Sequence, residues 1–404
     1  MPTFSLTSLY ASRVDGITGS VIDSSTSLLQ RQRHDIVRMA MGSPAREAIP
    51  SAVFGGLLGE LAADGASAFD YGPTEGDAAL RRALIDFLGG QGTPVDPDEL
   101  LITSGGMQGL DLVCKLFVER GDLVAVESPT YTNGAATISG YEGSMVEIAG
   151  DADGMDIDAL AAAAEEHGEP PKLIYTIPTF QNPAGTTLSL ERRERLIELA
   201  DDWGAVVLED DPYSLLRFEG EDLPTLRELG SGHVRVIGVR TFSKILAPGL
   251  RVGWLEAEPD VVTRMIDARQ GMDTCTAPPM QRLVARFLAG GHLDAHLTTL
   301  RTEYRRRKIS LQRALRHELA GLDASWTDPE GGFFLWLTLP ADIDTEALFP
   351  VALEEGVAYI PGPAFSIGGH FTDALRLAFS AEEPDRAREG VRRLARAIDR
   401  QLAA

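Results

Sequence analysis

The sequence predicts an α/β protein, with a large sheet-containing domain followed by a smaller α+β domain. Between about residues 100 and 255, short apolar runs alternate with helical stretches, which is typical of strand and helix units built around one sheet. The runs are apolar throughout, as expected for parallel strands that are buried on both faces. After Asp260 the pattern changes to long charged helices with a few strands, which indicates the second domain.

The elements of the large domain are predicted one by one from these runs. Strands are expected at residues 100–103, 123–127, 172–177, 205–209, 234–239 and 252–255. Residues 188–204 form an amphipathic stretch that starts with polar residues and stops at a glycine, so we expect a helix there. The Ala-rich residues 159–164 predict another helix.

The smaller domain is predicted from the C-terminal third of the chain. A long charged helix is expected at 293–319, and strand-like segments follow at 331–339 and 374–380. A closing helix is expected from Pro384 onwards.

Composition excludes several classes of protein. The 404 residues carry 37 Lys and Arg against 60 Asp and Glu, a formal net charge of -23. Phosphate backbones and anionic membranes are bound by clustered Lys and Arg, so we expect neither nucleic acid nor a membrane as partner. Cys114 and Cys275 lie far apart with no CxxC spacing, so no metal site or disulfide framework is indicated. The start of the chain lacks a signal-peptide run, which favours a cytoplasmic protein.

Lys244 is the first candidate catalytic residue. Only four of the 37 basic residues are Lys, and this one lies in VRVIGVRTFSKILAPGLRVGW, between two apolar β-type runs. A desolvated lysine with a lowered pKa is what a Schiff base to an aldehyde cofactor requires, because only the neutral amine attacks. An ordinary loop lysine is the alternative, and this segment alone leaves both interpretations open.

Two further segments have features of a ligand site. Asp210 follows an apolar strand in LEDDPYSLLRF, and strands of α/β proteins end at the crevice where ligands bind. An acid there could keep a pyridinium nitrogen protonated, although a helix cap or turn aspartate is commoner. Gly105 and Gly106, in TSGGMQGLDL, precede a helix whose first N–H groups favour a phosphate, but Gly-Gly turns before helices are frequent.

Nine segments in order match one family. They are SRVDGITGSVIDSSTSLLQ, DIVRMAMGSPAREAIP, YGPTEGDAALRRAL, ITSGGMQGLDL, VESPTYTNG, PTFQNPAGTTLS, LEDDPYSLLRF, TFSKILAPGLRVGW and LRLAFS. With them the chain resembles the fold-type-I pyridoxal-phosphate aminotransferases of class I/II, most closely the 2-aminoadipate, kynurenine and multi-substrate subgroup. The resemblance extends from about Ser12 to the C-terminus.

The resemblance implies a fold and an assembly. The large domain would be a mainly parallel, seven-stranded sheet that binds the cofactor, at residues 51–292. The N-terminal segment, 1–50, would cover the site and join the small domain at 293–404. Tyr71 would reach the phosphate of a partner subunit, so the active unit is expected to be a homodimer with shared sites.

The resemblance also assigns cofactor contacts. Lys244 would form the internal aldimine with pyridoxal 5'-phosphate and move the proton between Cα and C4′. Asp210 would pair with the pyridinium nitrogen, and Tyr131 would stack on the ring. The other implied contacts are Asn182 and Tyr213 at the ring oxygen, and Gly105, Gly106, Met107, Thr241, Arg251 and Tyr71 at the phosphate. Judged on pattern alone, core, turn or surface roles are favoured for Tyr131, Asn182, Arg251 and Arg376, and the resemblance favours the site roles instead.

The resemblance also implies substrate contacts, and the chain departs from the family pattern at three places. Arg376 and Asn182 would clamp the α-carboxylate, because a guanidinium binds a carboxylate with two parallel hydrogen bonds. Gly42 lies in Met-Gly-Ser-Pro, where the family usually has Gly-Gly-x-Pro, and Gly105-Gly106-Met107 replaces Gly-Ser-Gln. Asp23 stands where members that accept 2-aminoadipate often carry Arg. Since like charges repel, a neutral, aromatic or cationic donor side chain is expected.

The function implied is transamination from an L-amino acid to a 2-oxo acid, with 2-oxoglutarate as the expected acceptor, by a ping-pong mechanism. One alternative is another pyridoxal-phosphate reaction on the same scaffold, such as elimination, decarboxylation, cyclisation or oxidation, because the same residues serve those reactions. A second alternative is a ligand-sensing regulator, a class that carries a DNA-binding domain before this fold.

Overall fold

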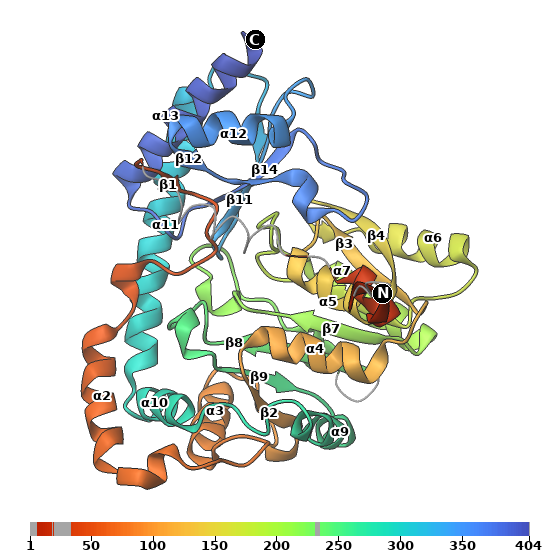
Figure 1. Ribbon diagram of the computed structural model, residues 1–404, viewed down its shortest axis with the longest axis vertical. Coiled ribbons are helices and arrows are strands. Elements are labelled where there is room, and N and C mark those ends of the chain that lie inside the picture. The colour runs from red at the N-terminus through yellow and green to blue at the C-terminus, as the bar shows by residue number, and fades with distance from the viewer. Residues whose placement is uncertain (1–5, 18, 20–33, 231–234, 404) are drawn as a thin grey trace, which may run out of the picture.

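The computed structural model describes residues 6–17, 19, 34–230 and 235–403. A large sheet lies at the centre of the molecule, a smaller sheet lies nearer the C-terminus, and the long helix α11 (His292–Glu318) passes beside both (Figure 1). The α/β fold class predicted from the sequence is confirmed.

The large sheet has eight strands. Their order is β2 (Leu100–Thr103), β9 (Gly253–Glu256), β8 (Arg235–Thr241), β7 (Val206–Asp210), β6 (Leu173–Thr176), β3 (Leu123–Ser128), β4 (Ser144–Asp151) and β5 (Gly154–Met155). The five strands β8, β7, β6, β3 and β4 run parallel, whereas β9 is antiparallel to both neighbours and β5 to β4. The expected seven strands are thus exceeded by one, because β5 is a two-residue return of the chain beside β4.

Helices cover both faces of this sheet, which explains the uninterrupted apolar strands. On one face, α4 (Gly106–Phe117), α5 (Thr132–Gly140) and α9 (Pro259–Gln270) pack on alternate strand residues such as Val124, Val126 and Leu208. On the other face, α6 (Ile157–His167) and α7 (Leu190–Trp203) pack on the intervening strand residues, such as Ala125 and Val207. In the central strands β3, β6 and β7, the residues that face either side of the sheet are therefore buried.

The predicted helix at 188–204 is α7, and its ends follow from the sequence. The Ser189 hydroxyl accepts a hydrogen bond from the backbone N–H of Arg192 at 3.4 Å and caps the first turn. Gly204 adopts the left-handed conformation that ends the helix, with φ of 64°.

The smaller sheet has four antiparallel strands. Their order is β10 (Ser325–Trp326), β11 (Phe334–Thr338), β14 (Ala374–Ala378) and β13 (Ile360–Pro361). The helices α11, α12 (Thr345–Glu355) and α13 (Pro384–Leu402) pack together beside it. The N-terminal segment joins this part through β1 (Val37–Arg38), which pairs in parallel with β12 (Val357–Ala358).

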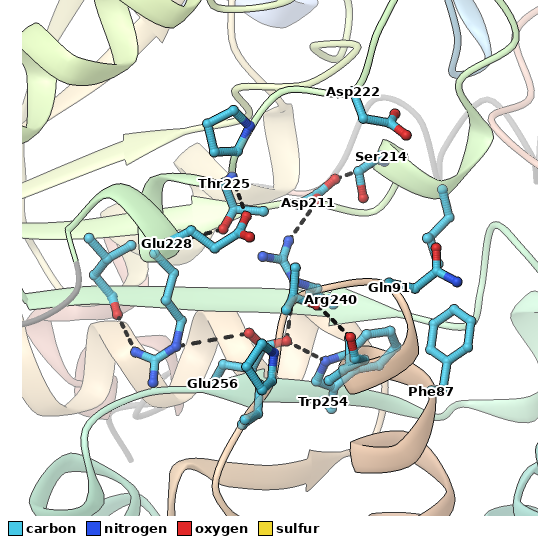
Figure 2. Close-up of a pocket in the computed structure, with 18 of the residues that line it drawn as sticks. Phe87, Gln91, Asp211, Ser214, Asp222, Thr225, Glu228, Arg240, Trp254 and Glu256 are labelled. Carbon is cyan, nitrogen blue, oxygen red and sulfur yellow. Dashed lines mark hydrogen bonds and ion pairs between the residues drawn. The ribbon is translucent and has the colours of Figure 1, made fainter.

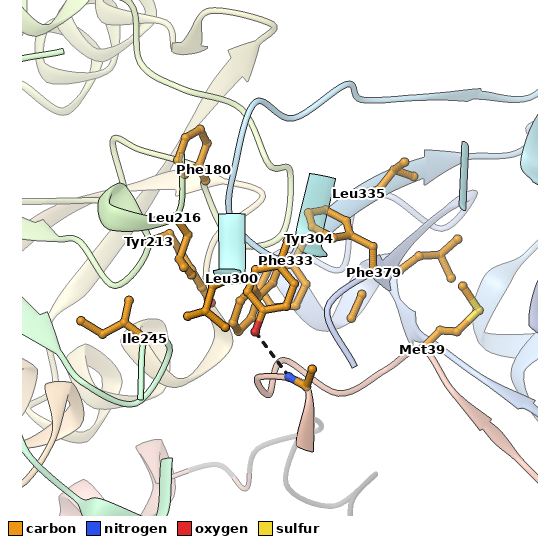
Figure 3. Packing of buried hydrophobic residues seen from close by; sticks show 14 of the residues in the cluster. Met39, Phe180, Tyr213, Leu216, Ile245, Leu300, Tyr304, Phe333, Leu335 and Phe379 are labelled. Carbon is orange, nitrogen blue, oxygen red and sulfur yellow. Dashed lines mark hydrogen bonds between the residues drawn. The ribbon is translucent and has the colours of Figure 1, made fainter. Parts of the chain in front are cut away.

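One hydrophobic cluster connects the two sheets at the place where the predicted site lies. Phe333 packs against Tyr304 of α11 with ring centroids 5.2 Å apart and against Tyr213, after β7, at 5.4 Å (Figure 3). The helices α2 (Ser51–Ala63) and α3 (Ala78–Gly90) pack on α10 (Pro278–Ala289) at the far end of α11. The boundaries predicted at residues 50 and 292 stay predictions. No described helix has the length and apolar character needed to cross a membrane.

Candidate active site

A cavity of about 240 Å³ lies at the carboxyl ends of β6, β7 and β8 and is closed by the N-terminal segment and the smaller sheet. Most of the predicted site residues line it. They are Gly42, Gly106, Met107, Tyr131, Asn182, Asp210, Tyr213, Thr241, Lys244, Arg251 and Arg376. Residues that lie more than 300 positions apart in the sequence thus meet in one cavity.

Lys244 lies in the turn that connects β8 to η7 (Pro248–Leu250), between the buried side chains of Phe242 and Ile245. Its Nζ donates a hydrogen bond to the Gly42 carbonyl oxygen at 2.8 Å. Burial and the nearby Arg376 guanidinium lower the pKa of Lys244 to about 8. A larger share of its amine is therefore neutral near pH 7 than for an ordinary lysine, which suits a nucleophile.

Asp210 ends β7 and is almost completely buried. Burial raises the pKa of its carboxyl to about 7, although Tyr175 opposes this by donating a hydrogen bond from its hydroxyl at 3.0 Å. A cationic partner would offset the burial, so the carboxylate is suited to a protonated ring nitrogen. The Tyr175 hydroxyl fits because α5 has glycine at position 134, where a Cβ would lie 2.4 Å from it.

A small polar pocket lies at the N-terminus of α4. Gly105 has φ of 84°, and a Cβ at this position would lie 2.6 Å from Nη2 of Arg251. Arg251 is itself in the left-handed region, with φ of 51°, and Nη2 donates to the Ser104 carbonyl at 3.1 Å. The Thr241 hydroxyl lies close by, bonded to the Ser243 hydroxyl at 2.9 Å. Helix N–H groups with a guanidinium and hydroxyls beside them form an anion site.

Two tyrosines and Met107 form other walls of the cavity. Tyr131 immediately precedes α5, and its hydroxyl lies 3.8 Å from Sδ of Met107. Tyr213 is buried against Phe333 and Phe334, with ring centroids 5.4 and 5.9 Å away. Aromatic side chains thus form part of the wall of a cavity that also holds charged groups.

Arg376, on β14, is fully buried although no described carboxylate lies within ion-pair distance of it. Its Nη1 donates to Oδ1 of Asn182 at 2.7 Å and its Nη2 to the Ala40 carbonyl at 2.8 Å, while Nε has no partner. The guanidinium carbon lies 4.0 Å from the ring centroid of Phe334. Burial lowers the pKa of Arg376 to about 10. A buried cation of this kind is poised for an incoming carboxylate.

A family model for aminotransferase class I and II matches residues 35–394. This chain belongs to that family. The aromatic-amino-acid aminotransferase 1 of Thermococcus litoralis is 36% identical over 406 residues, covering 99% of this chain and 96% of that protein. The 2-aminoadipate transaminase of Thermus thermophilus is 36% identical over 375 residues, covering 92% of each. A kynurenine aminotransferase of Pyrococcus horikoshii, solved in complex with PMP, has a TM-score of 0.92 at 35% identity, covering 99% of both chains.

The prediction of a pyridoxal-phosphate-dependent aminotransferase is therefore confirmed. The residues present in the cavity fit this cofactor. A lysine with a lowered pKa, a buried aspartate and an anion pocket at the α4 N-terminus offer partners for its aldehyde, ring nitrogen and phosphate.

Three predicted site residues do not line the cavity. Gly105 shapes the turn next to it, and Tyr71 is 90% exposed on the surface of the single chain. Asp23 lies outside the described residues. The structure also adds Tyr175, which sequence reasoning missed because a tyrosine inside an apolar strand is most simply a core residue.

Proposed function

We propose that the enzyme moves the α-amino group of an L-amino acid to a 2-oxo acid, 2-oxoglutarate in the first instance, in two half-reactions. The observation that carries this proposal is Arg376, a buried guanidinium with a free Nε and no described carboxylate partner, in one cavity with Lys244 and Asp210. An α-carboxylate bound at Arg376 and Asn182 brings the Cα of the substrate towards the Lys244 amine. Geometry of this kind supports proton transfer at Cα.

Each residue has a separate task in this proposal. Pyridoxal phosphate supplies the electron sink that stabilises negative charge at Cα. Lys244 would hold the aldehyde carbon of the cofactor, and its freed amine would carry the proton to and from the substrate Cα. Asp210 keeps the ring nitrogen protonated, and Tyr131 covers the ring face. The ring oxygen is contacted by Tyr213 and Asn182, and the phosphate by the backbone at Gly105, Gly106 and Met107 with Thr241 and Arg251.

The test is a single turnover with stoichiometric amino acid and no acceptor. Transamination predicts that the bound aldehyde form converts to the pyridoxamine form with release of one 2-oxo acid, whereas elimination, decarboxylation or oxidation yields other products. Lys244→Ala is expected to abolish both the covalent cofactor absorbance and turnover. Lys172→Ala is the control, because Lys172 forms a surface ion pair with Asp122 at 2.6 Å. Full activity of Lys244→Ala would refute the assignment.

We infer from Asp23 that the preferred amino donor has a neutral, aromatic or cationic side chain. The inference rests on charge and on the resemblance: an acid at the position where members that accept 2-aminoadipate often carry Arg would repel a distal carboxylate. Turnover of phenylalanine, arginine and 2-aminoadipate is to be compared for the wild type and Asp23→Arg. A clear wild-type preference for 2-aminoadipate, unchanged in the variant, would sink this inference.

We propose that the active unit is a homodimer in which Tyr71 completes the partner's phosphate site. In the single chain, large apolar side chains are exposed near this residue: Phe69 is 67% and Leu58 is 42% exposed. Such exposure favours a protein interface. Mixing Tyr71→Ala and Lys244→Ala subunits is expected to restore activity, because one site of the mixed dimer then has both wild-type residues. If Tyr71 serves its own subunit, mixing restores nothing.

We further infer a cytoplasmic enzyme whose partners are small molecules. Cys114 and Cys275 are both free thiols and buried, which accords with a reducing compartment. The formal net charge of -23 disfavours binding to nucleic acid and anionic membranes. Cell fractionation with an antibody to the chain tests the location, and recovery in the membrane or secreted fraction would contradict it.

A further inference from the structure

A cluster of buried charged side chains lines a second and larger cavity of about 690 Å³ (Figure 2). This cavity adjoins the active-site cavity, because Pro212 and Thr241 line both. Asp210 and Asp211 are consecutive at the end of β7, and Arg240 and Thr241 are consecutive at the end of β8. Consecutive residues of a strand point to opposite faces. Asp210 accordingly lines the active-site cavity, whereas Asp211 and Arg240 line the second cavity.

Asp211 uses its two carboxylate oxygens for two different connections. Oδ1 accepts hydrogen bonds from the backbone N–H groups of Tyr213, at 3.3 Å, and Ser214, at 2.9 Å. This is the pattern of an Asx turn, which fixes the backbone two and three residues onward. Oδ2 pairs with Nη1 of Arg240 at 2.5 Å. The turn that carries Tyr213 is therefore tied to the neighbouring strand.

Arg240 is held in place by two more carboxylates. Its Nη2 lies 3.4 Å from Oε2 of Glu209, and its Nε lies 3.3 Å from Oε1 of Glu256. Oε1 of Glu256 also accepts the indole N–H of Trp254 at 2.8 Å. Each of these charged side chains is buried. A buried charge that loses its partner is strongly destabilising, so these ion pairs hold the ends of β7 and β8 in one arrangement.

The segment between Asp210 and Tyr213 has open space on both sides. Pro212 lines the active-site cavity and also the second cavity. Tyr213 is packed against Phe333 and Phe334, but close packing cannot fix the backbone at Pro212, which borders a cavity on each side. The hydrogen bonds from the Tyr213 and Ser214 backbone to Asp211 fix the backbone conformation there.

We propose that Asp211, anchored by Arg240, is a positioning residue that holds the Asp210–Tyr213 segment in the conformation required to bind the cofactor. The inference rests on the cofactor contacts of Asp210 and Tyr213 under the proposed function. Asp211 itself faces away from the active-site cavity and touches neither cofactor nor substrate.

The experiment follows release of pyridoxal phosphate from the holoenzyme, together with thermal unfolding and kcat. Asp211→Ala is expected to speed release about tenfold, the size of effect expected from losing a hydrogen bond to a charged group. Asp211→Asn keeps an oxygen for the turn but loses the charge, so an intermediate rate is expected. Asp156→Ala is the matched control, because Asp156 caps α6 with the same pattern, at 2.9 and 3.1 Å, far from the site.

The outcomes distinguish a positioning role of Asp211 from a purely structural one. Faster release from Asp211→Ala than from Asp156→Ala, at a similar loss of thermal stability, supports the proposal. Equal release from these two variants overturns it, because Asp211 is then only structural. If Asp211→Ala does not fold, Asp211→Asn is compared with Asp156→Asn in the same way. Asp210→Asn and Tyr213→Phe test the proposed function separately: if neither speeds release, the cofactor contacts themselves are wrong.

Discussion

Replacing Arg376 by methionine should leave the protein as stable as before, or more stable, while removing most of its activity. Burial lowers the pKa of Arg376 from the usual 12.5 to about 10. At about 1.36 kcal/mol per pKa unit, the buried charge costs the cofactor-free protein about 3 kcal/mol. Its two hydrogen bonds, to Asn182 and Ala40, return about 1 kcal/mol each. The net change in the free energy of unfolding should therefore be a gain of about 1 kcal/mol.

The catalytic loss should be large, because the substrate carboxylate loses two charge-assisted hydrogen bonds. At about 1.5–3 kcal/mol each, kcat/KM should fall about 10²- to 10⁴-fold. Steady-state kinetics and urea unfolding of the cofactor-free enzyme measure both effects.

Arg193→Met is the matched control, because Arg193 is equally buried but fully bonded. Its guanidinium donates to the carbonyls of Leu188, Pro224 and Pro178 and to the Thr179 hydroxyl at 2.8–2.9 Å. Burial lowers the pKa of Arg193 as well, but its removal takes the donor from four acceptors instead of two. Arg193→Met should therefore be the more destabilising variant, by about 2 kcal/mol. The reasoning is refuted if Arg376→Met destabilises the protein as much as Arg193→Met does, or keeps more than a tenth of kcat/KM.

Three further predictions follow from the site. The rate at which cofactor-free enzyme binds pyridoxal phosphate covalently should rise with pH and level off above about 8, because the pKa of Lys244 is lowered to about 8; a rate still rising at pH 10 would contradict this. The pKa of Asp210 is raised from 3.8 to about 7, so its ionised form destabilises the cofactor-free protein increasingly as pH rises from 4 to 7. Asp210→Asn should therefore raise the melting temperature more at pH 8 than at pH 5. An equal gain at both pH values would argue against a raised pKa of Asp210. Gly134→Ala places a Cβ 2.4 Å from the Tyr175 hydroxyl and should lower stability by about 1–3 kcal/mol; Gly140→Ala on the same helix meets no atom within 4 Å and should be neutral or stabilising.

Most of the large sheet could be predicted because its strands are buried on both faces. The exceptions are β5, which has only two residues, and β4, which the sequence did not locate because Ile148 is its only buried residue. A strand near the sheet edge with exposed and half-exposed residues lacks the continuous apolar pattern that identifies its neighbours. The missing strand matters for the site only indirectly, since β4 lies on the far side of β3.

Arg376 and Tyr175 show why the site could be predicted only in part. On pattern alone, Arg376 could belong to the wet face of a half-exposed strand, yet every residue of β14 is buried, between β11 and β13. Tyr175 pairs with Leu208 in register, so it shares a face with Asp210, two residues further along β7. The burial of Arg376 and the position of Tyr175 beside Asp210 cannot be predicted from the local sequence, because each depends on which strands are neighbours in the sheet.

The active-site cavity carries positive charge although the whole chain is negative, and these buried charges destabilise the folded protein. The chain has a formal net charge of -23, which repels anionic 2-oxo acids at long range. Inside the cavity, Lys244, Arg251 and Arg376 face Asp210, so the local balance is cationic. Burial and, second to it, the charge of Arg376 lower the pKa of Lys244. A bound phosphate and a bound carboxylate would neutralise these buried positive charges. The affinity for anions therefore comes from groups that destabilise the ligand-free protein.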